Sequence, residues 1–164
     1  MALTTNTNFL QPNGFRVTIS RDNYPNLEFF AQSIVHPGIN SNATDVPFRH
    51  VNVAFPGDKA NFAPVSINVI LDEDMTAYTE IVNWVKFNVE NSYQAPVKRN
   101  VTATPSISDI RVSILSSHNN LNKTILYKNA FPTDVSTINL EASTTDIQYI
   151  TFTVDFKYDY WEFV

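Results

Sequence analysis

The strongest pattern in the chain is the run Ile150-Thr151-Phe152-Thr153-Val154-Asp155-Phe156-Lys157-Tyr158-Asp159-Tyr160. Every second residue of this run is apolar, and the residues between them are threonine, aspartate or lysine. Such alternation is typical of a β-strand that buries one face and exposes the other. Because the run is longer than an average strand, it predicts one long β-strand and a mainly β fold.

Shorter runs with the same period predict further strands, which short turns would join into antiparallel hairpins. The expected pairs are 15–20 with 27–34, 48–55 with 65–71 and 110–115 with 124–127, followed by a short strand near 138–140. Turns are expected at His36-Pro37-Gly38, with a positive φ at Gly38, at Pro56-Gly57-Asp58-Lys59 and at Phe131-Pro132-Thr133-Asp134. Residues 39–46 and 91–105 are expected to form loops.

One amphipathic helix is expected between these strands. Asp72-Glu73-Asp74 offers carboxylates where the N-terminus of a helix favours a capping oxygen and negative charge. From Met75 to about Val89, apolar residues recur every three or four positions and form one stripe, which Trp84 and Phe87 widen. The expected fold class is therefore an antiparallel β-barrel or β-sandwich with one flanking α-helix.

The length and composition favour a single domain. The chain has 164 residues, of which 43% are hydrophobic and 16% charged, so it can bury a sizeable core. We expect a flexible, polar N-terminal arm over residues 1–12 and one β domain over residues 13–164. The first residues do not resemble a secretion signal and no apolar run could span a membrane, so we expect assembly in the cytoplasm.

The charge balance and the absence of cysteine exclude several classes of function. Lys and Arg number 11 and Asp and Glu number 16, which gives a net charge of −5. A general nucleic-acid binder normally carries a basic face, so this balance argues against one. Without cysteine there is no disulfide, no thiol catalysis and no cysteine-ligated metal.

The polar residues give little support for a catalytic, metal or cofactor site. The carboxylates of residues 72–74 are explained by helix capping, and Asp155 and Asp159 lie roughly 13 Å apart on the predicted strand, too far for a paired acid and base. His36, His50 and His118 fall on separate elements, and Lys98-Arg99 reads as a solvated loop. We expect no enzyme and no cofactor. Trp84 or Trp161 could serve a sugar-binding surface.

The order of four motifs resembles the tail tube proteins of T4-like, contractile-tailed bacteriophages. The first motif is Asn13-Gly14-Phe15-Arg16-Val17 with Leu27-Glu28-Phe29-Phe30-Ala31-Gln32-Ser33 and Pro37-Gly38. The second is Pro47-Phe48-Arg49 with Phe55-Pro56-Gly57-Asp58-Lys59, and the third is Leu71-Asp72-Glu73-Asp74 before a helix with Asn83-Trp84. The fourth is Asn129-Ala130-Phe131-Pro132, where Ala130 replaces an expected glycine, with Asp159-Tyr160-Trp161-Glu162.

This resemblance implies a structural protein of the virion tail. Six copies would form a ring, neighbouring subunits would pair strand to strand, and the rings would stack into a tube inside a contractile sheath. Phage DNA would pass through the lumen without specific binding, and sheath and baseplate proteins would be partners. Asn52, Ser66 and Asn68 are the expected lumen-facing residues. Pro56, Gly57, Asp58 and Lys59, residues 39–46 and the N-terminal arm are candidates for contact between rings.

Three alternatives remain open on the sequence. A baseplate component that initiates or terminates the tube could share the same fold. A secretion-system tube protein would obey similar physics. A carbohydrate-binding β-sandwich that uses Trp84 or Trp161 is the alternative from a different class.

Overall fold

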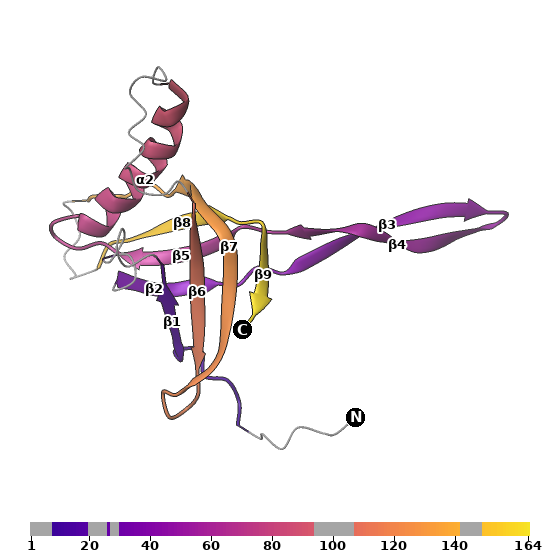
Figure 1. Ribbon diagram of the computed structural model, residues 1–164, viewed down its shortest axis with the longest axis horizontal. Coiled ribbons are helices and arrows are strands. Elements are labelled where there is room, and N and C mark those ends of the chain that lie inside the picture. Colours follow the sequence, from indigo (N-terminus) through magenta and orange to yellow (C-terminus); the bar gives the residue numbers. More distant parts are fainter. Residues whose placement is uncertain (1–7, 20–25, 27–29, 94–106, 142–148) are drawn as a thin grey trace.

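The computed structural model describes residues 8–19, 26, 30–93, 107–141 and 149–164. They form a body of antiparallel strands with one helix against it, and a two-stranded arm that extends far from the body (Figure 1). The mainly β class predicted from the sequence is confirmed. Apart from the arm, the described strands form one seven-stranded antiparallel sheet, which bends into two regions and does not close into a barrel over the described residues.

The body is built from two sheet regions that share one strand. The first, the β6 sheet, contains β1 (Phe15–Thr18), β6 (Ser108–Leu115), β7 (Leu121–Val135) and β9 (Tyr160–Phe163). The second, the β5 sheet, contains β7, β8 (Thr151–Lys157), β5 (Val65–Ile70) and β2 (Ala31–Val35). The strands of the two regions cross steeply, as β6 and β7 run upright while β5 and β8 run across (Figure 1).

The chain passes from one sheet region to the other at Asn129 in β7. This residue has a φ of 55°, a left-handed conformation that asparagine tolerates better than most residues. Its backbone N–H donates to Asp109 at 3.1 Å, and its side-chain amide donates to Asp159 at 2.6 Å. Lys128 also bonds Asp109, with 2.8 Å between Nζ and Oδ2. These bonds fix the bend between the two sheet regions.

The core lies between the two sheet regions and helix α2 (Thr76–Tyr93). The largest fully buried side chains come from all three parts, namely Trp84, Tyr127, Phe152, Phe156, Ile67, Ile81 and Ile110. The helix covers the β5 sheet, where its Trp84 ring lies 5.9 Å from that of Phe156 and its Tyr78 ring 5.4 Å from that of Phe152. The predicted helix and the prediction of Trp84 as a core residue are therefore confirmed.

The helix N-terminus is capped as the sequence predicted, by one of the three carboxylates. Asp72 Oδ2 accepts the backbone N–H of Thr76 at 3.2 Å and also the Thr76 hydroxyl. These hydrogen bonds lower the pKa of Asp72. Glu73 and Asp74 are exposed.

Two of the three predicted hairpins are wrong. β1 pairs with β6, about a hundred residues further along, and β2 pairs with β5. β5 pairs with β2 and β8, so the expected hairpin of residues 48–55 with 65–71 does not form. The hairpin of β6 with β7 is confirmed, with its turn at residues 116–120. Alternation identifies a strand, but it carries no information about which distant strand will pair with it.

The largest departure is the arm, formed by β3 (Ile39–Phe48) and β4 (Val51–Phe62). Residues 39–46, expected as a loop, are a strand, and so are Pro56 to Lys59, expected as a turn. Gly38 does not have the positive φ of a type II turn. The arm is an insertion between β2 and β5, which themselves form an antiparallel pair.

Three smaller expectations also fail. β7 continues without a turn through Phe131–Asp134, and residues 138–140 are not a strand. The long C-terminal strand divides at Tyr158 and Asp159 into β8 and β9, because β7 bends beside it at Asn129 and both pieces stay paired with β7. Residues 91–93 extend the helix, and residues 94–105 of the expected loop lie outside the described residues.

Candidate assembly surfaces

The β3–β4 arm is an amphipathic ribbon that the body does not cover. Cross-strand pairing places Val46 beside Val53 and Phe48 beside Val51 on one face, with Phe55 next to them. The other face carries Asp45, Pro47, Asn52 and Ala54. Five apolar side chains of the first face are 41–68% exposed, namely Val46, Phe48, Val51, Val53 and Phe55. A continuous exposed apolar face of this kind indicates an interaction surface.

The predicted inter-ring residues lie in the middle of the arm. Pro56 pairs with Ala43, and Ala60 pairs with Ser41, so residues 57–59 form a bulge opposite Asn42 alone. A Cβ on Gly57 would lie 1.8 Å from the carbonyl oxygen of Asn42, which explains why a glycine stands there. The expectation that Pro56 to Lys59 form a hairpin tip is wrong. The tip is at Arg49 and His50.

The predicted lumen residues are divided between two surfaces. Ser66 and Asn68 share the face of β5 that points away from helix α2, beside Asp155 and Thr153 of β8. Ser66 Oγ donates to Asp155 Oδ1 at 2.5 Å. Asp134 of β7 stands directly opposite Asp155 on the same face. Asn52 does not join them, because it belongs to the polar face of the arm.

Two borders of the β5 sheet are open in the described part of the chain. At one border, β2 pairs with β5 only. At the other, β7 pairs with β8 from Phe131 to Val135, while its partner on the other side, β6, ends at the Ser108–Ala130 pair. Exposed borders of this kind can accept a strand from another chain.

The root of the arm is attached to the body through His36, which lies between β2 and β3. Its Nδ1 is 2.6 Å from the hydroxyl of the buried Tyr127, and its ring lies 4.8 Å from that of Trp161 in an edge-on contact. Burial lowers the pKa of His36 and raises the pKa of Tyr127. The contact therefore joins two uncharged side chains at neutral pH. The sequence did not single out this role, since Tyr127 and Trp161 are distant from His36 along the chain.

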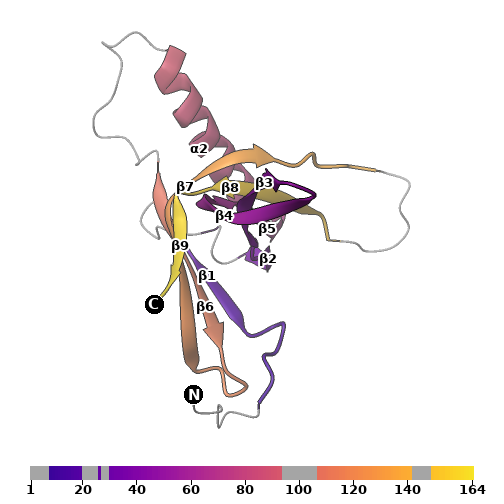
Figure 2. The same cartoon turned by 90° about the vertical axis from the view of Figure 1, so that its right-hand side faces the viewer.

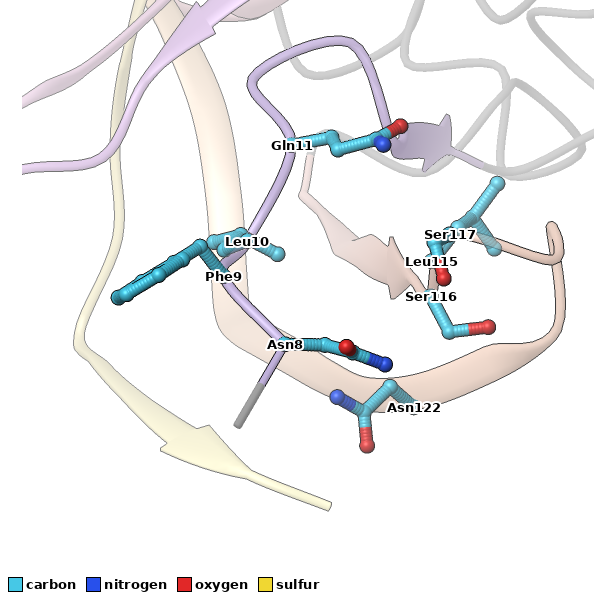
Figure 3. A pocket seen from close by; sticks show the side chains of 8 residues that line it. All are labelled: Asn8, Phe9, Leu10, Gln11, Leu115, Ser116, Ser117 and Asn122. Carbon is cyan, nitrogen blue, oxygen red and sulfur yellow. The ribbon is translucent and has the colours of Figure 1, made fainter. Parts of the chain in front are cut away.

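The N-terminal segment lies against the β6–β7 turn. Residues Asn8 to Gln11 border a small hollow of about 120 Å³ together with Leu115, Ser116, Ser117 and Asn122 (Figure 3). Gly14 N–H donates to Gln11 C=O at 3.2 Å, and its own carbonyl accepts Leu115 N–H at 2.8 Å. Phe9 is 94% exposed. The prediction of a flexible arm over residues 1–12 concerns mostly residues 1–7, which lie outside the described residues.

The chemistry-bearing residues do not converge. Asp155 and Asp159 bond Ser66 and Asn129 respectively, and His36, His50 and His118 lie on separate elements. Over the described residues, no group of three histidines or carboxylates could hold a metal ion, and no helix is long and apolar enough to cross a membrane. Trp84 is buried, which excludes it as a sugar platform. Lys98-Arg99 lies outside the described residues.

An exposed apolar arm and open sheet borders are surfaces that can bind other chains. The family model for phage tail tube proteins matches residues 2–164. The chain belongs to the phage tail tube protein family. This match covers nearly the whole chain, so the resemblance seen in the sequence motifs is confirmed. No curated protein sequence matches the chain.

Solved structures with the same fold come from contractile injection systems. The chain is similar to one in the tube-terminating cap of the anti-feeding prophage, with 13% identity, a TM-score of 0.69, and 99% and 95% of the two chains covered. It is also similar to a chain in the extended sheath–tube complex of an extracellular contractile injection system, with 13% identity, a TM-score of 0.68 and 99% of each chain covered. At these identities the similarity establishes the tail-tube fold alone.

Proposed function

We propose that this chain is the subunit of a phage tail tube, in which rings of six copies stack into a conduit for DNA ejection inside a contractile sheath. The observation that carries the proposal is the β3–β4 arm, whose apolar face is left uncovered by the described residues. An isolated two-stranded hairpin is only marginally stable in water. The arm therefore needs contacts from other subunits, and membership of the tail tube family makes further copies of the chain the natural source.

The open borders of the β5 sheet supply a way to close the ring. β2 of one subunit would pair with the Phe131–Val135 part of β7 in the next, so that each copy adds the four strands of its β5 sheet to a shared barrel. Heterologous contacts that close on themselves produce a ring, and closure removes the exposed strand borders. The β5 sheet would then form the wall of the conduit.

The charge of that wall would suit the passage of DNA. Because α2 covers one face of the β5 sheet, the opposite face, with Ser66, Asn68, Asp134 and Asp155, would face the lumen. The same face also carries Lys157 of β8, so each copy would add two carboxylates and one ammonium group. Six copies would give a net acidic lining that repels the phosphate backbone instead of holding it. The position of Asn52 would depend on the course of the arm.

The remaining contacts would lie outside the ring wall. The arm, including Pro56, Gly57, Asp58 and Lys59 at its bulge, would connect one ring to the next. Sheath and baseplate proteins would bind surfaces that the ring leaves exposed. The protein would assemble in the host cytoplasm and reside in the virion tail.

Negative-stain microscopy and native mass spectrometry of the purified protein test this proposal. We expect hexameric rings or long tubes. A protein that stays monomeric at high concentration contradicts the proposal. Six-membered rings that never stack would instead identify a component of the same fold that initiates or terminates a tube.

A further inference from the structure

The β3–β4 arm is joined to the body by two short connectors that interrupt the strand ladder. The β2–β5 ladder ends at the pair of Val35 with Ser66, and the ladder of the arm begins at the pair of Ile39 with Phe62. The chain between these pairs contains one proline on each side, and a proline cannot donate a backbone hydrogen bond to a ladder. Backbone pairing therefore does not fix the direction in which the arm leaves the body.

A small rotation at this root would move the tip of the arm a long way. With twelve residues in β4 and about 3.3 Å per residue, the arm is about 40 Å long. A rotation of about 10° at the root would displace the tip by about 7 Å over this length. Figure 1 shows that no other described element lies beside the outer part of the arm, and Figure 2 looks along the arm toward the body. The position of the tip is therefore set at the root.

Two tyrosine hydroxyls hold the root of the arm, one on each side. The hydroxyl of Tyr127 lies 2.6 Å from Nδ1 of His36, which directly follows β2. The hydroxyl of Tyr158 donates to the backbone carbonyl of Ala63, which directly follows β4, at 2.9 Å. The ring of Phe62 at the end of β4 also lies 6.0 Å from the ring of Tyr158. Each connector is thus attached to the body by one tyrosine.

Both tyrosines are themselves held firmly in the body. Tyr127 is fully buried, and Tyr158 packs against the core. Their rings lie 5.0 Å apart in an edge-on contact. Tyr127 comes two residues before Asn129, and Tyr158 comes directly before Asp159, so both stand beside the bend that the hydrogen bond between Asn129 and Asp159 helps to fix. The two hydroxyls are therefore held at a fixed spacing at the base of the arm.

We propose that Tyr127 and Tyr158 are positioning residues for assembly, which set the direction of the arm by each holding one side of its root. This inference rests on the proposed function for the need to place the arm against another subunit. Two attachment points fix a direction, whereas one point would leave the arm free to rotate about it. The rings are needed for the core, and the hydroxyls make the bonds to the root of the arm.

Distance measurements by pulsed electron paramagnetic resonance on the isolated subunit test the proposal. The chain has no cysteine, so Ser33→Cys in β2 and His50→Cys at the tip of the arm place one spin label on the body and one on the arm, both at exposed positions. The parent should give a narrow distribution of distances. The double variant Tyr127→Phe and Tyr158→Phe should at least double its width, because both hydroxyls are lost while both rings remain. Tyr160→Phe is the matched control, because it removes an exposed hydroxyl of β9, and it should leave the width unchanged.

The concentration at which assemblies appear provides the second measurement. The double variant Tyr127→Phe and Tyr158→Phe should require a several-fold higher protein concentration, because an arm that rotates freely loses more conformational freedom on binding. Tyr160→Phe should assemble like the parent. Denaturant unfolding of all three proteins checks that the subunits remain folded.

Three results would contradict the inference in different ways. An equally narrow distribution of distances in the parent and the double variant overturns the role of the two hydroxyls. A broadened distribution with an unchanged assembly threshold overturns the link between arm direction and assembly. A parent chain that forms no assembly removes the proposed function and this link, while the distance distributions still decide whether the hydroxyls hold the arm.

Discussion

The replacement Phe48→Ser tests whether the arm is an assembly surface. Phe48 lies on the apolar face of the β3–β4 arm and is 64% exposed. It touches no part of the core, so its loss should change the stability of the isolated subunit by no more than about 0.5 kcal/mol, as for other surface substitutions. Any large effect must then come from contacts between subunits.

The size of that effect follows from the exposed area. A phenylalanine side chain offers roughly 200 Å², so 64% exposure leaves about 130 Å² to bury, worth about 3 kcal/mol at about 25 cal/mol per Å². Since about 1.4 kcal/mol is tenfold in an association constant, each arm contact should weaken by roughly 100-fold. This is an upper value, because packing at an interface is rarely complete.

The assay compares the concentration at which assemblies appear for the parent, for Phe48→Ser and for Asn52→Ser, by sedimentation and negative-stain microscopy. Asn52→Ser is the matched control, because it changes the polar face of the same arm. We expect the threshold to rise strongly for Phe48→Ser and little for Asn52→Ser. Equal thresholds for all three proteins, with unchanged thermal unfolding, would refute the assignment of the apolar face to subunit contacts.

Four further predictions follow from single features. Gly57→Ala should impair assembly, because the added Cβ meets the Asn42 carbonyl, whereas Gly38→Ala should not, because nothing lies within 4 Å of its Cβ; equal assembly of both variants argues against the bulge. Trp84→Ala should destabilise the subunit by about 3–5 kcal/mol in denaturant unfolding, and a smaller loss would mean that α2 packs loosely. Burial lowers the pKa of His36 below 6.5, so its contribution to the free energy of unfolding should be complete above pH 6.5 and decline as the pH falls below it. Between pH 7.5 and pH 5.5, the free energy of unfolding should therefore fall less for His36→Gln than for the parent. An equal fall in both proteins counts against this role. Tubes of Asp134→Lys should bind DNA in a salt-sensitive manner while parent tubes do not, and DNA binding by neither would remove the argument for an acidic lumen.

The elements that depend only on residues close together in the chain were predicted correctly from the sequence. The β6–β7 hairpin needs only two alternating runs and the short turn at residues 116–120. Helix α2 needs only its apolar stripe and the Asp72 cap. In both cases the residues that decide the structure lie within about thirty positions of one another, so the alternation or the apolar stripe can be read directly from the sequence.

Pairing over long distances and contacts outside the subunit could not be predicted in this way. Nothing in Phe15–Thr18 indicates that its partner is β6 rather than the next strand. The alternation of Phe48 to Phe55 correctly indicated one apolar face, but a buried face was the natural interpretation, and the structure leaves that face exposed. Residues 39–46 contain Asn, Ser and Asp, which are poor strand formers, so pairing with β4 overrides their local preference.

The residues of the candidate lumen surface were predicted only in part, because the pairing of distant strands decides which of them lie on one face. Ser66 and Asn68 share one face of β5 as expected from their spacing. Asn52 was grouped with them through a hairpin that does not form, and Pro56 to Lys59 through a turn that is a bulge. Asp134 was missed, since only its pairing opposite Asp155 reveals which face it occupies.

Because the strand β7 belongs to both sheet regions, it couples them mechanically. Its 15 residues take part in both sheet regions, and the bend at Asn129 is fixed by bonds to Asp109 and Asp159. The two regions cannot tilt against each other without breaking these bonds or changing the backbone dihedral angles at the bend. A load applied to one region therefore passes directly to the other, which makes the subunit stiff in shear and torsion without any cross-link.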